Sequence, residues 1–304
     1  MSVTLRGRRR RDGRLGARNH VLVLPSVVCA NQTATLIGSE PGAVAVVHQH
    51  GCGQVGDDVA HTERAFLGSA TNPNVGAVVV VSLGCETIQG RRLARLIERG
   101  GQRVAFVGIQ QLGGTFKTVD HGRLAVGRLR AELEADGLVE AGLEELVLGI
   151  AADGATRAVR ELAEAARIAG ASVVLAVPEG ARGDWEGAPV IGYGQAAAAG
   201  ISVVEQAGEG TEQHLALAGA GAQVIVSLRG PGRAPQGFAT GPVLAVAGDP
   251  GIYAALEDDF DLDGSSAGAE DVWRRVISVF NGEQTASEKR GARDFVLHRI
   301  ARTM

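Results

Sequence analysis

The stretch GAVVVVSL, residues Gly76–Leu83, is apolar along almost its whole length. A strand with one face in water would alternate apolar and polar side chains, whereas a strand covered on both faces does not. Strands of the second kind belong to parallel sheets, where helices pack on both faces. This run therefore predicts a central strand of a parallel α/β sheet.

Strand and helix patterns alternate on both sides of this run. We expect strands at Val21–Leu24, Ala43–Val47 and Arg103–Ile109, and helices at Ala30–Ile37, Asp57–Leu67, Thr87–Glu98 and Thr118–Ala135. Strands that alternate with helices indicate a doubly wound sheet with right-handed crossovers.

A second alternation follows a break near Asp136–Leu143. We expect strands at Leu146–Ile150, Ser172–Val177, Gln223–Leu228 and Pro242–Ala247, helices at Thr156–Ala169, Thr211–Ala218, Ala269–Phe280 and Ser287–Ala301, and a Gly-rich loop at residues 179–194. The sequence thus predicts an α/β protein with two Rossmann-like, doubly wound halves and mainly parallel sheets. The predicted domains are residues 1–138 and 139–304.

Composition excludes several classes of function. The net charge of −4 gives no case for a nucleic-acid or membrane partner, and no run approaches the ~20 apolar residues of a membrane span. An arginine-rich segment, residues 6–18, precedes the apolar run Val21–Ala30, as in a secretion signal, but Pro25 interrupts that run. We expect a cytoplasmic protein and, by default, a homo-oligomer.

Polar residues follow the ends of the predicted strands in the first half. Because ligands bind beyond the carboxyl ends of parallel strands, these residues are expected to share one rim. They are Cys29-Ala30-Asn31, the run His48-Gln49-His50-Gly51-Cys52, Gly84-Cys85-Glu86 and Gly113-Gly114-Thr115.

Thiolate, imidazole and carboxylate side chains on one rim are ligands for a transition metal or an iron–sulfur cluster. The spacing is not that of a zinc finger, and three cysteines, an odd number, argue against a disulfide framework. A single cysteine at the end of a strand is more often a packed core thiol than a ligand, so the metal interpretation depends on the whole set. Gly113-Gly114-Thr115 is either a plain turn or an anion cradle. In the second half, the loop Arg229–Arg233 offers two guanidiniums suited to a carboxylate, or simply solvated arginines.

Several ordered motifs resemble the altronate/galactarate dehydratase family. They are the opening RDGRLGARN at 11–19 with VLVLPSVVCAN after it, His48 with Gly51-Cys52-Gly53, Asn72-Pro73-Asn74, Leu83-Gly84-Cys85-Glu86, Gly113-Gly114-Thr115, and the tail DFDLDG at 259–264 with GEQT at 282–285. The large subunit of sulfolactate sulfo-lyase resembles the same arrangement of motifs. The resemblance therefore does not decide whether the leaving group is water or sulfite.

The resemblance implies a hydro-lyase that removes water from a small hydroxy acid or sugar acid with a divalent metal, Fe²⁺ first, with Mn²⁺ or an iron–sulfur cluster as alternatives. In this sequence, the resemblance implies that the metal ligands are His48, Cys52, Cys85 and Cys29, and that His50 and Glu86 transfer protons. Substrate binding is expected at Arg18, Asn19, Asn31, Gly114, Thr115 and Arg233.

The chain also departs from the family pattern. Ala151–Thr156 (AADGAT) replaces a cysteine–glycine–glycine–serine–aspartate run, and a central segment is shortened between about Glu179 and Gln195. The small SAF-type domain is absent, which suggests a separate SAF-domain subunit as partner. The alternative function is therefore a catalytically silent member that serves as a metal- or ligand-binding subunit.

Overall fold

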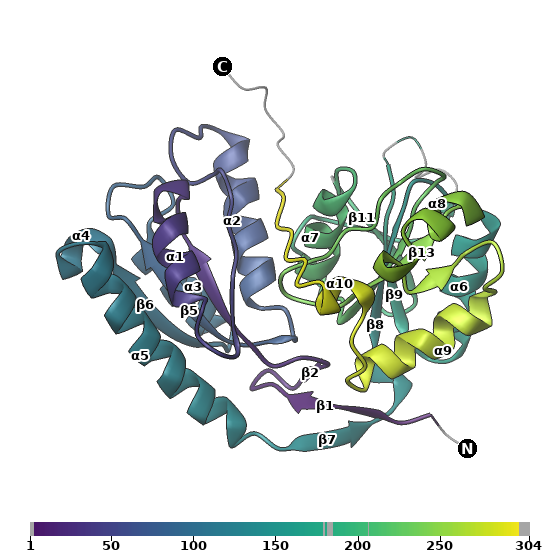
Figure 1. The fold of residues 1–304 in the computed structure, drawn as a ribbon, viewed down its shortest axis with the longest axis horizontal. Helices are drawn as coiled ribbons and strands as arrows, with labels where there is room; N and C mark the ends of the chain where they lie inside the picture. Colours follow the sequence, from purple (N-terminus) through teal and green to yellow (C-terminus); the bar gives the residue numbers. More distant parts are fainter. Residues whose placement is uncertain (1–2, 179, 181–184, 206, 298–304) are drawn as a thin grey trace.

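The computed structural model describes residues 3–178, 180, 185–205 and 207–297. Two parallel sheets, each covered by helices, lie side by side, and a small antiparallel sheet runs beneath both (Figure 1). The predicted α/β fold class is confirmed.

The first half is a four-stranded parallel sheet in the order β4-β3-β5-β6. Its strands are β3 (His20–Pro25), β4 (Ala43–Ala45), β5 (Val75–Ser82) and β6 (Arg103–Gly108), and its helices are α1 (Asn31–Ile37), α2 (Asp57–Ala70), α3 (Gly90–Arg99), α4 (Ile109–Leu112) and α5 (Thr115–Glu134). All eight residues of β5 are buried, since β3 and β6 flank it and helices cover both faces. The apolar run 76–83 is thus a central strand, as predicted.

The second half is a seven-stranded parallel sheet in the order β10-β11-β9-β8-β12-β13-β14. Its strands are β8 (Val147–Ala152), β9 (Ser172–Ala176), β10 (Val190–Ile191), β11 (Ile201–Val204), β12 (Val224–Leu228), β13 (Val243–Ala247) and β14 (Leu262–Asp263), and its helices are α6 (Arg157–Ile168), α7 (Thr211–Gly219), α8 (Pro250–Ala255), α9 (Ala269–Phe280) and α10 (Ala286–Lys289). β10, β11, α8 and β14 were not predicted, and β10 lies inside the expected loop 179–194.

The arginine-rich N-terminal segment forms a strand, β1 (Leu5–Arg9), which pairs with β2 (Leu15–Gly16) and β7 (Leu138–Ala141). Leu5 and Leu15 are fully buried in the core of the second half. The predicted break at 136–143 therefore contains a strand. Because β1 packs with the second half, the N-terminal segment links the two halves.

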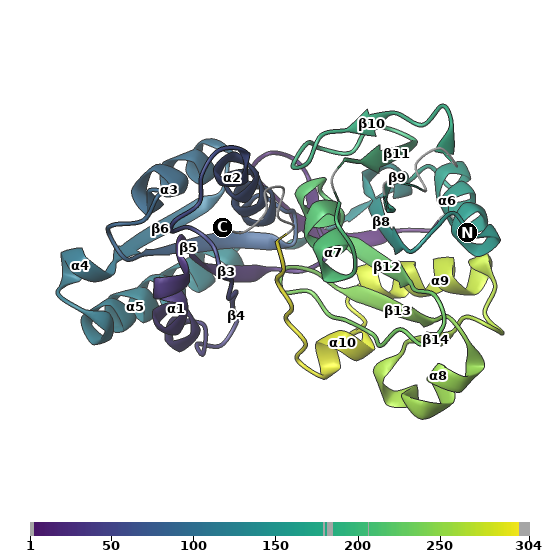
Figure 2. The ribbon, with the colours of Figure 1, turned by 90° about the horizontal axis from the view of Figure 1, so that it is seen from above.

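The halves meet along helices α2 and α7, which face each other in both views (Figures 1 and 2). At this contact a Cβ on Gly68 would lie 2.7 Å from the Cα of Gly219, so only glycine allows the approach. The Asn72 amide donates to the carbonyls of Ala218 and Ala222, each at 2.9 Å. Asn72, from the motif Asn72-Pro73-Asn74, is therefore a structural residue that binds one half to the other.

The C-terminal helix is shorter than predicted. It ends at Lys289 instead of continuing to Ala301, because Gly291 has a φ of +69°, which an α-helix does not accommodate. Residues 292–297 then run between the halves (Figure 1), and 298–301 lie outside the described residues. None of the helices in the described ranges is long and apolar enough to cross a bilayer.

Candidate functional site

Two adjoining cavities, one between the halves and one beside it in the second half, together form what we call the interdomain cleft. The first, of 830 Å³, is lined by Asn31 and Val47–His50 from the first half and by Gly208, Glu209, Glu212 and Phe295–Leu297 from the second. The second, of 670 Å³, shares Glu209, Glu212 and Val296 with it and adds Asp153, Arg229 and Arg233. The predicted rim of the first half therefore faces the corresponding rim of the second.

His48 lines the cleft, but both of its ring nitrogens are hydrogen-bonded to the backbone. Nε2 lies 2.7 Å from the carbonyl of Pro25, and the N–H of His50 donates to Nδ1 at 3.2 Å. The imidazole also packs on Phe66, with ring centroids 4.7 Å apart. Burial lowers the pKa of His48 to about 4, so the ring is neutral near pH 7. Because Nδ1 accepts from the N–H of His50, the proton of the neutral ring is on Nε2.

His50 is held by a short chain of side-chain hydrogen bonds. The amide of Gln54 lies 3.2 Å from Nδ1 of His50 and donates to the hydroxyl of Thr62 at 2.9 Å. A donor at Nδ1 makes that nitrogen an acceptor, so the proton of the neutral ring is on Nε2. This arrangement fixes the orientation of the His50 ring.

Asn31 also lines the cleft, as expected of a substrate-binding residue. Its amide donates to the carbonyl of His48 at 2.7 Å, which holds the loop that carries both histidines. Asn31 thus has a positioning role in this structure.

Glu86, predicted to transfer protons, is tied into the first half. Its carboxylate accepts from the N–H of Gly84 at 2.6 Å and the hydroxyl of Ser26 at 2.9 Å, and the side chain is buried. Burial alone would raise the pKa of Glu86, but these hydrogen bonds outweigh it and hold the pKa below its usual value. A base that works near neutral pH needs the opposite shift, so the structure favours a structural role for Glu86.

The predicted metal ligands do not form a metal site in this structure. Within the described ranges no three His, Cys, Asp or Glu side chains come together as a metal would require. Cys29, Cys52 and Cys85 are free and exposed, and the two nitrogens of His48 already have hydrogen-bond partners. The donors as arranged here do not fit a bound metal ion.

Arg18 and Asn19, predicted to bind substrate, instead bond to the protein. Arg18 donates to both carboxylate oxygens of Glu288 and to the carbonyls of Val279 and Glu283. Asn19 accepts from Arg10 at 2.7 Å. The sequence motif could not show this, because the partners of Arg18 lie more than 260 residues away.

Gly114 and Thr115 begin α5 and are not among the residues that line the interdomain cleft. Gly114 has a φ of +120°, and its carbonyl accepts from the hydroxyl of Thr118 at 2.8 Å. Of the two interpretations offered by the sequence, this geometry favours a helix-initiating turn.

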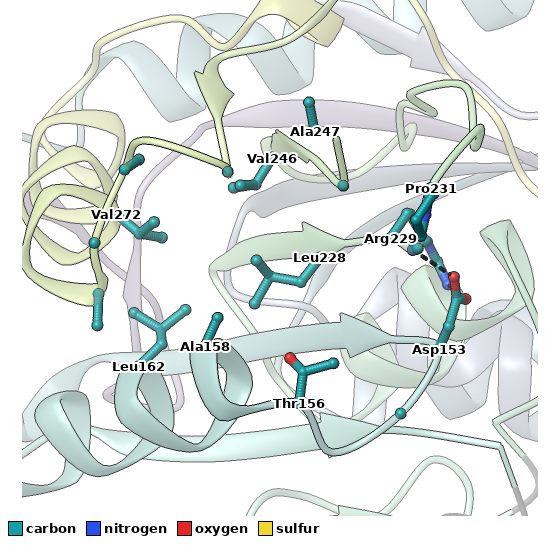
Figure 3. Close-up of a pocket in the computed structure, with 17 residues that line it drawn as sticks. Asp153, Thr156, Ala158, Leu162, Leu228, Arg229, Pro231, Val246, Ala247 and Val272 are labelled. Atoms are coloured by element: carbon teal, nitrogen blue, oxygen red, sulfur yellow. Dashed lines mark hydrogen bonds and ion pairs between the residues drawn. The ribbon is translucent and has the colours of Figure 1, made fainter. Parts of the chain in front are cut away.

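The second half contributes an ion pair at the cleft. Arg229, which follows β12, donates to Asp153, which follows β8, at 3.1 Å (Figure 3). It also donates to the side chain of Gln213 at 2.6 Å. Burial would raise the pKa of Asp153, but the N–H of Gly230 and the guanidinium of Arg229 hold it below its usual value. Both groups are therefore charged at neutral pH.

Arg233, predicted to bind substrate, is exposed and lines the cleft. It has no hydrogen bond or ion pair with any part of the chain that the structure describes, so it is available to an anionic ligand. Arg233 is therefore placed where a substrate-binding arginine is needed.

Sequence reasoning missed the carboxylates Asp153, Glu209 and Glu212. Asp153 follows a predicted strand, so the same carboxyl-end rule that selected the first rim could have found it. Glu209 precedes α7 and Glu212 lies in its first turn, and their position in the cleft depends on how the two halves pack.

Two sequence models of one family match most of the chain. The model described as "D-galactarate dehydratase/Altronate hydrolase, second domain" matches residues 7–134, and that described as "D-galactarate/Altronate dehydratase, C-terminal" matches residues 182–303.

Three relatives share parts of the sequence. An altronate dehydratase of Bacillus subtilis (strain 168) is 29% identical over 163 residues, which are 50% of this chain and 32% of that protein. An altronate dehydratase of Escherichia coli (strain K12) is 36% identical over 92 residues, 27% of this chain and 19% of that protein. A (2R)-sulfolactate sulfo-lyase subunit beta of Chromohalobacter salexigens is 40% identical over 81 residues, 26% of this chain and 21% of that subunit. The matched parts thus span no more than 32% of these relatives' lengths.

Proposed function

Because this chain belongs to the D-galactarate/altronate dehydratase family, we propose that it is a hydro-lyase acting on a small hydroxy acid in the interdomain cleft. The observation that supports this most is that Glu209 lines both cavities of the cleft, the first of which is lined by His50 and the second by Arg233. A cation, a carboxylate and an imidazole are the groups that an elimination next to a carboxylate needs.

In the proposed reaction, Arg233 binds the substrate carboxylate, since guanidinium groups match carboxylates in geometry and charge. Glu209 removes the proton from the carbon beside that carboxylate. The C–H electrons form the new double bond, and the bond from the adjacent carbon to its hydroxyl breaks. The imidazolium form of His50 gives its Nε2 proton to the leaving oxygen, which departs as water, and the ring is left neutral. A 2,3-dihydroxy acid would give an enol that becomes a 2-keto acid.

No step is assigned to a metal ion, because the predicted ligands do not converge among the described residues. We further propose that the chain is the large part of a two-part cytoplasmic enzyme. One relative carries the name "subunit beta", which supports a partner subunit.

A second function is a binding subunit without turnover. Two observations favour this second function. The carboxylate of Glu86 is held in a structural role. The run Ala151–Thr156 contains one ionisable side chain, Asp153, and therefore offers few groups for proton transfer.

The experiment is a screen of 2,3-dihydroxy acids for 2-keto products, with the chain alone and with a small SAF-type protein. Turnover that falls about 100-fold in His50→Asn and Arg233→Gln supports the hydro-lyase. The matched control is Arg157→Gln, a highly exposed arginine on α6. Binding of the acids without turnover under any condition would instead support the second function.

A further inference from the structure

A third cavity, of 360 Å³, lies in the second half at the carboxyl ends of β8, β12 and β13 (Figure 3). It adjoins the interdomain cleft, because Asp153 and Arg229 line both. Its volume falls within the range of about 300–1,000 Å³ typical of small-molecule sites.

The cavity occupies the switch point of the second sheet. From β8 the chain goes to β9 on one side, and it later returns to β12 on the other side. The helix after β8, α6, packs against α9, whereas β12 leads to β13 through a loop, and the cavity lies among these elements at the carboxyl ends of the strands. Open α/β sheets bind ligands at this place.

The equivalent crevice of the first sheet, between β3 and β5, is filled. The Ser26 hydroxyl and the Glu86 carboxylate bond to each other at 2.9 Å there, and a Cβ on Gly90 would lie 2.5 Å from the side chain of Ser82. The two halves thus differ: one crevice is closed by its own side chains and the other is open.

The walls of the open crevice are mainly hydrocarbon. Ala158 and Leu162 from α6, Leu228 from β12, Val246 from β13 and Val272 from α9 surround the space (Figure 3). Such walls bind an alkyl or aryl group by removing it from water.

The polar side chains of the lining already have partners. Asp153 and Arg229 bond to each other, and the Thr156 hydroxyl accepts from the N–H of Val159 as the cap of α6. A substrate with a hydroxyl on every carbon would lose hydrogen bonds to water here without replacement.

We propose that this cavity binds an apolar group of the substrate, so that the chain takes hydroxy acids with an alkyl or aryl tail in preference to polyhydroxylated sugar acids. This proposal rests on the proposed function for the position of the carboxylate at Arg233. The tail then reaches the cavity past the Asp153–Arg229 pair.

The test is calorimetric binding of 2-hydroxybutanoate, 2-hydroxyhexanoate, 2-hydroxyoctanoate and gluconate. Each added methylene is expected to tighten binding about fourfold until the cavity is full, and gluconate should bind more weakly than 2-hydroxyhexanoate. Affinity independent of chain length, or tighter binding of gluconate, would overturn the proposal.

Two cavity-filling variants test whether the increase in affinity with chain length arises in this cavity. Ala158→Leu and Ala267→Leu fill it from two sides and should abolish the gain with chain length, whereas Ala254→Leu, an exposed helical alanine outside the lining, should keep it. Circular dichroism checks that each variant folds. If one of the two cavity-filling variants does not fold, the other is used for the binding series. A gain that survives both filled cavities contradicts the proposal.

Binding and turnover separate the two proposals. A chain-length gain in the 2-hydroxy acids, without any 2-keto product from the 2,3-dihydroxy acids, leaves the pocket in place and rejects the hydro-lyase. Turnover of short 2,3-dihydroxy acids with a flat binding series rejects the pocket alone.

Discussion

Arg18 and Glu288 lie 270 residues apart in the sequence and form a two-point ion pair, with Nε 2.7 Å from Oε1 and the second contact at 2.8 Å. The pair connects the turn before β3 in the first half to α10 at the end of the second. Neither side chain is more than 20% exposed. It is one of the contacts that hold the two halves together.

Arg18→Met should destabilise the protein by about 3 kcal/mol, because it leaves the Glu288 carboxylate half-buried without its partner. Urea unfolding at pH 7 measures this. Glu288→Gln should cost less, since an amide can still accept from Arg18. Equal and small losses in both variants would show that the pair contributes little.

The same pair makes stability depend on pH at the acid end. Burial would raise the pKa of Glu288, but the hydrogen bond and charge of Arg18 outweigh it and hold the pKa below its usual value. A carboxyl with a lowered pKa stabilises the fold at pH values above about 4.3, and this contribution is lost as pH falls through the folded-state value. The loss of stability between pH 5 and pH 3 should therefore be smaller in Glu288→Gln than in the wild type.

His214 should give a second pH dependence, nearer neutrality. The ring is fully buried, and burial together with the charge of Arg229 lowers its pKa to about 3. The unfolded chain binds a proton near pH 6.5 and the folded chain does not, so stability falls as pH drops from 6.5 towards 3. The slope from one such group approaches about 1.4 kcal/mol per pH unit.

His214→Gln should reduce the slope of unfolding free energy against pH by about that amount, whatever its effect on stability at pH 7. His121→Gln, at an exposed position on α5, is the control and should leave the slope unchanged. An unchanged slope in His214→Gln would mean that the ring is protonated in the fold.

Two glycine substitutions in helices should have opposite effects. Gly68→Ala places a Cβ 2.7 Å from the backbone of Gly219, so α2 and α7 must separate and the protein should lose stability. Gly127→Ala on α5 meets no atom within 4 Å and should stabilise by about 0.5–1 kcal/mol, because alanine favours helix. Thermal unfolding of both variants tests this, and a stable Gly68→Ala would contradict the close packing of the halves.

The metal content of the chain is a further prediction. Because the donors do not converge, we expect less than one equivalent of iron after anaerobic purification, and the same amount in Cys52→Ser. Elemental analysis measures both. One equivalent of iron that is lost in Cys52→Ser would restore the ligand set inferred from the family resemblance.

Local sequence determined the fold class and the positions of the rims. The run 76–83 could be interpreted without any contact, because an unbroken apolar strand is stable only between two helical layers. The carboxyl-end rule placed His48 and His50 at a cleft for the same reason, since strand direction alone decides on which edge a loop emerges. The shortened last helix is a local feature that was missed, although Gly291 was visible in the sequence.

Tertiary structure decided what each polar side chain does. Glu86 has the residue type of a base, but Ser26 and the N–H of Gly84 take up its oxygens. Arg18 has the residue type of a carboxylate binder, but its carboxylate is Glu288 of the same chain. A side chain's chemistry is set by its residue type, whereas its partners depend on how distant segments pack, and for that reason only the folded structure distinguishes Arg233 from Arg18.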